Sequence, residues 1–253
     1  MCNITKGLFL LLAGVSIASP AMAGTKVGDF DIGSNMSMTT NYVWRGVSQS
    51  DKHAAVQGGI TVNHATGLYA GAWASSVDFD DNSEASMELD LFGGFAYEFS
   101  SGLKLDVGVI HYDYPGAAGR LQYDFNEVYL GGSYKINGLG MSAKYSYSND
   151  FFGPSLSVSS NNKSAYYVEG ALTYDLPQEF VVAAHYGYTA GKNFDNPATV
   201  GNPNSYNDYS FGVSKEILGF SVDLSFYGTD RDGRILSGDN ASDRVVLKFT
   251  KNF

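Results

Sequence analysis

Hydrophobic residues recur at every second position over most of this chain. Between residues 101 and 109 one set of alternate positions is aliphatic and the other is polar or glycine; the aliphatic set is Leu103, Leu105, Val107 and Val109. The same alternation runs through residues 138–148 and 219–229. Because successive side chains of a strand point to opposite faces, a period of two predicts strands with one apolar and one polar face.

Twelve stretches show this alternation. They lie near residues 34–47, 54–64, 68–78, 85–98, 103–113, 125–135, 139–148, 165–175, 179–189, 208–216, 219–229 and 243–253. Most are about as long as a tilted membrane-spanning strand, which needs roughly 9–11 residues. Alternation alone is equally compatible with a β-sandwich, whose apolar faces pack on each other instead of on lipid.

The connections between these stretches alternate in length, and this favours a membrane barrel. Short turns fall at 65–67, 99–102, 136–138, 176–178 and 217–218, whereas longer polar segments fall at 48–53, 78–84, 113–124, 149–163, 190–208 and 229–243. Short periplasmic turns that alternate with longer extracellular loops, with an even strand count, are typical of bacterial outer-membrane barrels. The sequence therefore predicts an all-β, antiparallel up-and-down transmembrane β-barrel of about 12 strands over residues 34–253, with both termini in the periplasm.

The N-terminus has the features of a secretory signal peptide. Lys6 precedes an apolar run from Leu8 to Ile17, and small residues follow from Ser19 to Ala23. The apolar run is shorter than the roughly 20 residues of a spanning helix, which disfavours the alternative of a membrane anchor. We expect cleavage after residue 23, a mature chain that starts near Gly24, and a periplasmic segment over residues 24–33. The single cysteine, Cys2, lies in the cleaved part, so no disulfide or thiol chemistry is expected.

The last predicted strand ends on an aromatic residue. Val245, Leu247 and Phe249 alternate before Phe253, although Lys251 interrupts the pattern. This ending resembles the C-terminal signal that the outer-membrane assembly machinery reads. The other expected partners are outer-membrane lipid, lipopolysaccharide and small solutes.

Four stretches resemble a family of proteobacterial porin-like proteins of the TorF type, a conserved outer-membrane family of unknown function. They read T-T-N-Y-V-W-R-G-V-S-Q-S from Thr39 to Ser50, L-Y-A-G-A-W-A-S-S-V-D-F from Leu68 to Phe79, Y-D-Y-P-G from Tyr112 to Gly116 and N-E-V-Y-L-G-G-S-Y from Asn126 to Tyr134. The resemblance implies an outer-membrane barrel that passes solutes. It supplies no catalytic or ligand residues.

The odd or even position of a residue along a strand, its parity, also predicts which side chains lie in the interior of the barrel. In the first stretch Met36, Met38, Tyr42 and Trp44 alternate with polar residues at odd positions, which are Asn35, Ser37, Thr39, Asn41 and Arg45. Arg45 is then expected near the outer mouth, either as a constriction residue or, the interpretation we favour, in an ion pair that braces the wall. The predicted pore-lining charges are Arg45, Glu88, Asp90, Lys104, Asp106, Glu127, Lys144, Glu169, Asp223, Arg244 and Lys248. These six acids and five bases nearly balance, and twelve strands should leave a narrow lumen.

The net negative charge of the mature chain falls mainly on the predicted outer segments. Removal of the signal peptide deletes Lys6 and no acid, so 15 bases face 26 acids and the net charge is −11. The six long segments hold 14 acids and 6 bases, a net charge of −8. This predicts a modest cation preference that arises at the outer rim and weakens with salt. One acidic loop contains Asp78, Asp80, Asp81 and Glu84, but Ser83 and Leu89 break the spacing of a calcium loop, so a solvated loop is favoured over a metal site.

The sequence contains no arrangement typical of an enzyme. The four histidines lack the spacing of a zinc-protease or nucleophile motif, and no basic patch with interleaved aromatics predicts nucleic-acid binding. We therefore expect no enzymatic activity, cofactor or metal. The predicted function is a porin-like channel for passive diffusion of small polar solutes or ions. The alternative is a non-conducting surface, structural or adhesion barrel, and a lipid-modifying barrel enzyme ranks third.

Overall fold

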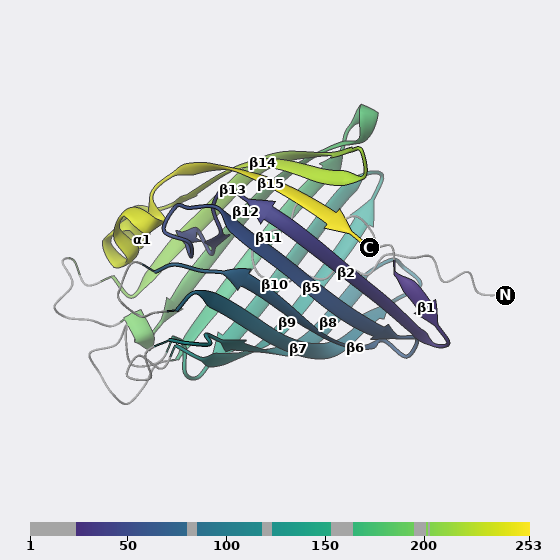
Figure 1. Ribbon diagram of the computed structural model, residues 1–253, viewed down its shortest axis with the longest axis horizontal. Helices are drawn as coiled ribbons and strands as arrows, with labels where there is room; N and C mark the ends of the chain where they lie inside the picture. The colour runs from purple at the N-terminus through teal and green to yellow at the C-terminus, as the bar shows by residue number, and fades with distance from the viewer. Residues whose placement is uncertain (1–23, 80–84, 118–122, 153–163, 195–200, 202) are drawn as a thin grey trace.

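Twelve antiparallel strands close into one barrel. The computed structural model describes residues 24–79, 85–117, 123–152, 164–194, 201 and 203–253 (Figure 1). The barrel strands are β2 (Phe30–Thr39), β5 (Ala55–His64), β6 (Leu68–Ser76), β7 (Met87–Glu98), β8 (Lys104–Asp113), β9 (Phe125–Ile136), β10 (Leu139–Ser148), β11 (Ala165–Asp175), β12 (Phe180–Gly191), β13 (Ser205–Ile217), β14 (Phe220–Thr229) and β15 (Arg244–Asn252). Each pairs with its neighbours in chain order, and β15 pairs with β2 to complete the ring. The predicted fold class is confirmed.

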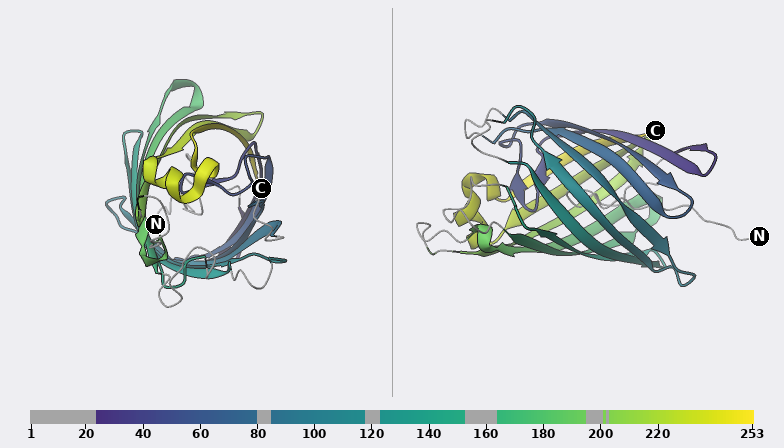
Figure 2. Two further views of the ribbon diagram at one scale, coloured as in Figure 1. Left: turned by 90° about the vertical axis from the view of Figure 1, so that its left-hand side faces the viewer. Right: turned by 90° about the horizontal axis from the view of Figure 1, so that it is seen from below.

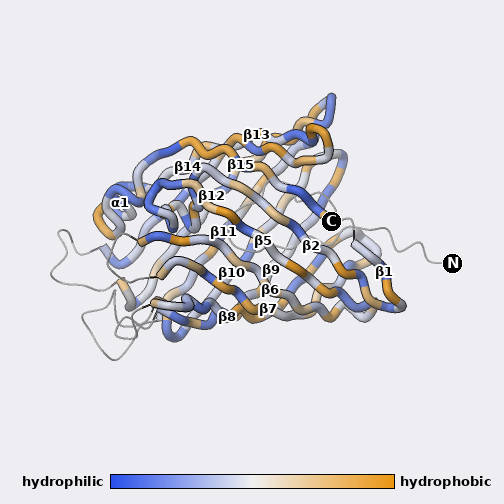
Figure 3. The backbone as a smooth tube through the Cα atoms, in the orientation of Figure 1, coloured by the Kyte–Doolittle hydropathy of each residue, from blue (hydrophilic) through white to orange (hydrophobic). Residues whose placement is uncertain are grey.

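The alternation of the sequence becomes the two faces of this wall. On β8, Val107 and Val109 are 52% and 55% exposed on the outer surface, whereas Gly108 between them is buried. Apolar and polar stretches alternate along the strands in Figure 3. A ring of strands leaves no unpaired edge in lipid, and the apolar outer face suits the hydrocarbon core of a membrane.

The predicted first strand is wrong over its second half. β2 starts earlier, at Phe30, where it already pairs with β5, and its first residues also pair with the short β1 (Thr25–Val27). After Thr39 the chain leaves the wall. It returns to the wall as β5, which pairs with β2 along the whole length of β2. Residues 40–54 instead fold inside the ring, where β3 (Val43–Trp44) and β4 (Val47–Ser48) form a hairpin (Figure 2, left). Tyr42 and Trp44, which parity had placed on the lipid face, are 3% and 7% exposed in the interior.

A helical connection lies at the end of the barrel that carries the long loops. Between β14 and β15 the chain forms α1 (Arg231–Ser237) and the 3-10 turn η4 (Gly238–Ala241), which cover part of the opening (Figures 1 and 2). Asp230 caps α1 by accepting a hydrogen bond from the Gly233 amide at 2.9 Å. The described residues also contain the 3-10 turns η2 (Pro177–Glu179) and η3 (Lys192–Phe194). Among the described residues, no helix is long and apolar enough to cross a membrane.

Candidate pore constriction

The β3–β4 hairpin turns through Arg45 and Gly46. Both residues have positive φ, +48° and +78°, as a two-residue turn with the twist of a β-hairpin requires. Glycine adopts this conformation freely, but for arginine it costs roughly 1 kcal/mol. The contacts that the Arg45 side chain makes with the barrel wall offset this cost.

Arg45 is bound to the wall by charge and by aromatic rings. Its Nη2 donates to Oε1 and Oε2 of Glu127 on β9, at 2.7 and 2.8 Å. The guanidinium carbon lies 4.1 Å from the ring centroid of Trp44 and 4.3 Å from that of Tyr167. The Tyr206 hydroxyl donates to the Arg45 carbonyl at 3.2 Å. The ion pair is buried, with 5% and 3% of the two side chains exposed, and its hydrogen bonds join a charged donor to a charged acceptor, which makes them stronger than neutral ones.

The tip of the hairpin contacts β13 and β14, on a different part of the barrel wall from β9. A Cβ atom added to Gly46 would lie 2.6 Å from Cγ2 of Thr229 on β14 and 2.7 Å from Cβ of Asp208 on β13. At the base of the hairpin, the Tyr42 hydroxyl donates to Glu88 Oε1 on β7 at 3.0 Å. The segment therefore contacts the barrel wall from β7 to β14, and it crosses the lumen between them.

Aromatic side chains fill the space on one side of the hairpin. Trp44 stacks on Phe151 at a centroid distance of 5.8 Å and meets the edge of Tyr112 at the same distance. Tyr112 in turn stacks on Phe125 at 4.3 Å. These rings pack the hairpin against β8 and β9.

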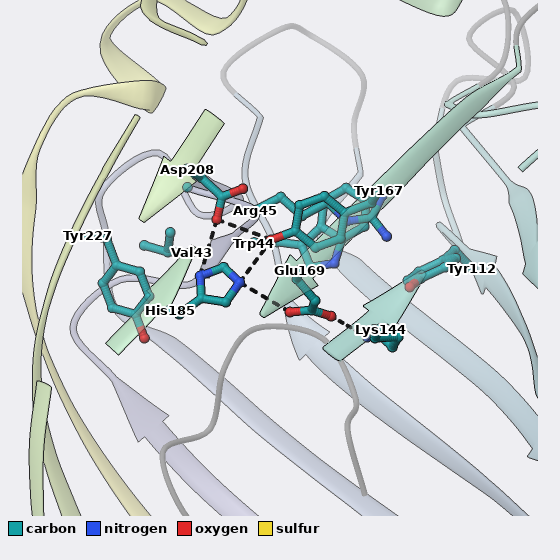
Figure 4. Close-up of a pocket in the computed structure, with 11 residues that line it drawn as sticks. Val43, Trp44, Arg45, Tyr112, Lys144, Tyr167, Glu169, His185, Asp208 and Tyr227 are labelled. Atoms are coloured by element: carbon teal, nitrogen blue, oxygen red, sulfur yellow. Dashed lines mark hydrogen bonds and ion pairs between the residues drawn. The ribbon is translucent and has the colours of Figure 1, made fainter. Parts of the chain in front are cut away.

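A polar network lies beside the hairpin on β10 to β13. Lys144 Nζ lies 2.8 Å from Glu169 Oε1, and Glu169 Oε2 lies 3.2 Å from His185 Nε2. His185 Nδ1 is 3.5 Å from Asp208 Oδ1, which also accepts from the Tyr167 hydroxyl at 3.2 Å (Figure 4). With the hairpin, these residues line a small polar pocket (Figure 4).

Gly187 provides the room for this network. It lies between Glu169 and Asp208 in the register of β11, β12 and β13. A Cβ atom there would overlap the Tyr167 hydroxyl and lie 2.5 Å from Asp208 Oδ2. A side chain at this position would therefore displace Tyr167 or Asp208.

Two carboxyl groups are buried beside the base of the hairpin. Glu88 and Asp90 are 2% and 0% exposed and lie on the same face of β7. Glu88 accepts the hydrogen bond from Tyr42.

The other charges that parity assigned to the lumen lie away from the hairpin. Asp106 accepts from the Tyr69 hydroxyl at 2.7 Å, and Tyr69 also bonds the Tyr129 hydroxyl. Asp223 accepts from Ser225 at 2.8 Å and faces Lys248 in the register of β14 and β15. The remaining two are Lys104, 3.4 Å from Glu98, and Arg244, which donates to carbonyls of the α1–η4 connection.

Sequence reasoning missed Asp208 as an interior residue. It was counted in an outer segment, but β13 begins at Ser205, and Asp208 is 2% exposed inside the barrel. The alternation of Tyr206, Asp208 and Ser210 with Asn207 and Tyr209 was the available signal. The lumen at the hairpin is consequently more acidic than parity had indicated.

The acidic loop falls mostly outside the described residues. Of its four acids only Asp78 is described; its amide donates to the Gln49 carbonyl at 2.9 Å, so this end of the loop is tied to the hairpin segment. Asp80, Asp81 and Glu84 lie outside the described part. Within the described ranges no group of three or more His, Cys, Asp or Glu residues is arranged to hold a metal ion.

The closed ring of twelve alternating strands defines an integral β-barrel protein of the bacterial outer membrane. Residues 23–252 match the family described as "Bacterial protein of unknown function (Gcw_chp)", and the chain belongs to this family. No curated protein matches it.

Solved structures with the same fold include two barrels of similar size. The NanC porin aligns with a TM-score of 0.56 and 11% identity over 87% of this chain and 97% of its own. The COG4313 outer membrane channel from Pseudomonas putida F1 aligns with a TM-score of 0.53 and 11% identity, over 93% of this chain and 100% of its own. At this identity the likeness concerns the fold.

Proposed function

We propose that this protein is an outer-membrane channel for passive diffusion of small polar solutes or ions, with a bore set by the β3–β4 hairpin. The observation that carries the proposal is the hairpin held across a closed barrel, with a small polar pocket on one side of it. Charged and hydroxyl side chains line that pocket, as they do in pores that pass hydrated solutes. An apolar plug would instead expel water from the whole cross-section.

Two likenesses add support. The two solved barrels with the same fold are described as a porin and an outer membrane channel. The motif from Thr39 to Ser50, on which the resemblance to TorF-type proteins mainly rests, is the hairpin segment itself. The motif that distinguishes this chain therefore coincides with the element that sets the bore.

Single-channel recording in planar bilayers tests the proposal. We expect current steps from the purified protein, and larger steps from Trp44→Ala, because Trp44 packs the hairpin against the wall. Leu218→Ser is the matched control, since Leu218 is 95% exposed in the turn between β13 and β14 and touches no part of the hairpin. A heat-dependent shift in gel migration checks that each variant is folded.

The possible results separate the candidate functions. Steps from the native protein support a channel. Silence from the native protein and from Trp44→Ala, with both folded, contradicts the proposal and favours a non-conducting surface or structural barrel.

A further inference from the structure

The outer face of the barrel wall is almost free of charge. Along the twelve barrel strands, the positions that share a face with the apolar residues carry three charged side chains within the described ranges: Asp113, Lys215 and Lys251. Asp113 is the last residue of β8, at the end with the long loops. Both lysines lie near the opposite end, which carries the short turns, β1 and the C-terminus and is the periplasmic end in the topology of such barrels (Figure 1).

The two lysines lie in one sector of this wall. Lys215 on β13 pairs in register with Val222 on β14, which pairs with Phe249 on β15, two residues before Lys251. Strands are about 4.8 Å apart and rise about 3.3 Å per residue, so the two lysine Cα atoms are roughly 12 Å apart. Each lysine can therefore bind an anionic group of its own within a single patch.

Each lysine lies over a phenylalanine ring of the same face. The ammonium nitrogen of Lys215 is 4.5 Å from the ring centroid of Phe180, and that of Lys251 is 5.5 Å from the centroid of Phe220. These rings are 36% and 45% exposed on the outer surface. Lys251 also donates to the Gly219 carbonyl at 2.9 Å. Because Phe180 and Gly219 adjoin the short turns, both ammonium groups are directed toward the periplasmic end and away from the middle of the wall.

Neither ammonium group has a carboxylate partner among the described residues. Lysines on the inner face do have one: Lys135 Nζ lies 2.7 Å from Asp175 Oδ2, and Lys144 Nζ lies 2.8 Å from Glu169 Oε1. A charge on the outer face of a membrane barrel is costly in the hydrocarbon region and nearly neutral at the level of the lipid headgroups. The two outer lysines therefore fit the headgroup level, where an anionic group from outside the chain is available to them.

We propose that the outer wall at β12 to β15 is a docking surface for anionic phospholipid of the periplasmic leaflet. Lys215 and Lys251 each bind one headgroup phosphate, and the two phenylalanine rings contact the carbon atoms next to it. Positive charge without a partner beside an exposed apolar ring matches a phosphate that is attached to acyl chains. Lipopolysaccharide lies in the opposite leaflet. The inference concerns the outer face of the barrel and does not depend on whether the lumen conducts.

Native mass spectrometry of the purified protein tests the proposal, with dioleoylphosphatidylglycerol and dioleoylphosphatidylcholine as the two probes. Both lipids have the same acyl chains and a phosphodiester, but only the first has a net negative charge. We expect the native protein to bind two molecules of phosphatidylglycerol in preference to phosphatidylcholine. Lys215→Gln and Lys251→Gln should each weaken this binding about fivefold at the site they change, the factor expected for one lysine near an anionic lipid surface. The double variant should show no preference, whereas arginine at both positions should keep it.

Lys135→Gln is the matched control, because Lys135 lies at the same end of the barrel and is half exposed, but has the inward parity of β9. Its lipid binding should equal that of the native protein. A folded double variant that still prefers phosphatidylglycerol, or an equal loss in the control, overturns the inference. Equal binding of the two lipids by the native protein does the same, and so does displacement of phosphatidylglycerol by an equal concentration of inorganic phosphate. If the double variant fails the heat-migration check, the two single variants decide the outcome.

Discussion

Replacement of Arg45 by alanine is the sharpest perturbation of the hairpin. It removes the guanidinium that bonds both oxygens of Glu127 and lies between two aromatic rings. Loss of one partner from a buried ion pair costs about 3–5 kcal/mol, and each cation–π contact adds about 0.5–2 kcal/mol. Two effects oppose this loss: Glu127 keeps the hydrogen bond from Tyr112 at 3.3 Å, and alanine removes the long side chain from a constrained turn. We therefore expect the free energy of unfolding to fall by about 3 kcal/mol, near the lower limit of the range for such pairs.

The same change should alter the current more than the ion preference. Without its anchor the hairpin tip is held only by packing, so Arg45→Ala should give larger and noisier single-channel steps. The acids of the outer segments are unchanged, so the cation preference predicted from them should persist. Urea unfolding followed by the fluorescence of Trp44 and Trp73 gives the stability, and planar-bilayer recording gives the conductance. Arg45→Lys is the control, since it keeps the charge but loses the planar contact with the rings.

A double-mutant cycle with Glu127→Gln isolates the pair. If the ion pair holds the hairpin, the double variant should lose less stability than the sum of the single losses, with a coupling of about 1.5–3 kcal/mol. Additive losses, together with an unchanged conductance of Arg45→Ala, would refute the reasoning that this pair fixes the constriction.

Three further predictions concern the hairpin segment and the N-terminus. Burial raises the pKa of Tyr42 and of Tyr114 well above the ordinary value, so these phenols stay protonated in the folded barrel while the unfolded chain ionises near pH ~10. Stability should therefore be complete below that pH and fall as the pH rises above it, and Tyr42→Phe should flatten this slope in urea unfolding between about pH 9 and 11; an identical slope in the variant would contradict the assignment. Gly46→Ala should destabilise the protein by about 1–3 kcal/mol, because alanine at a φ of +78° is strained and its Cβ meets the wall; the midpoint of urea unfolding measures this, and no shift would show that the tip does not touch the wall. The intact mass of protein purified from outer membranes should correspond to a chain that starts near Gly24, and a mass that includes residues 1–23 would show that the segment is retained.

The sequence by itself determined the wall of the barrel. Along β8, for example, alternate residues face lipid and lumen, because a strand has only two faces. In a membrane barrel the outer face is apolar and the inner face is polar. Short polar turns such as Asn137–Gly138 marked where neighbouring strands reverse. These are local properties, and they were enough to give the strand count and the order of pairing.

Only the tertiary structure decided what occupies the interior. Tyr42 and Trp44 continue the parity of Met36 and Met38, and only Thr40 and Val43 interrupt the alternation, so the sequence gives little sign that the chain leaves the wall after Thr39. The hairpin folds inward because Trp44 packs on Tyr112, Phe125 and Phe151 and Arg45 pairs with Glu127. These partners are 68–107 residues away from Trp44 or Arg45 in sequence. The same holds for Asp208, which meets His185 only because β12 and β13 are adjacent. Periodicity fixes the face on which a side chain lies, whereas burial among distant partners fixes whether a segment stays in the wall or crosses the lumen.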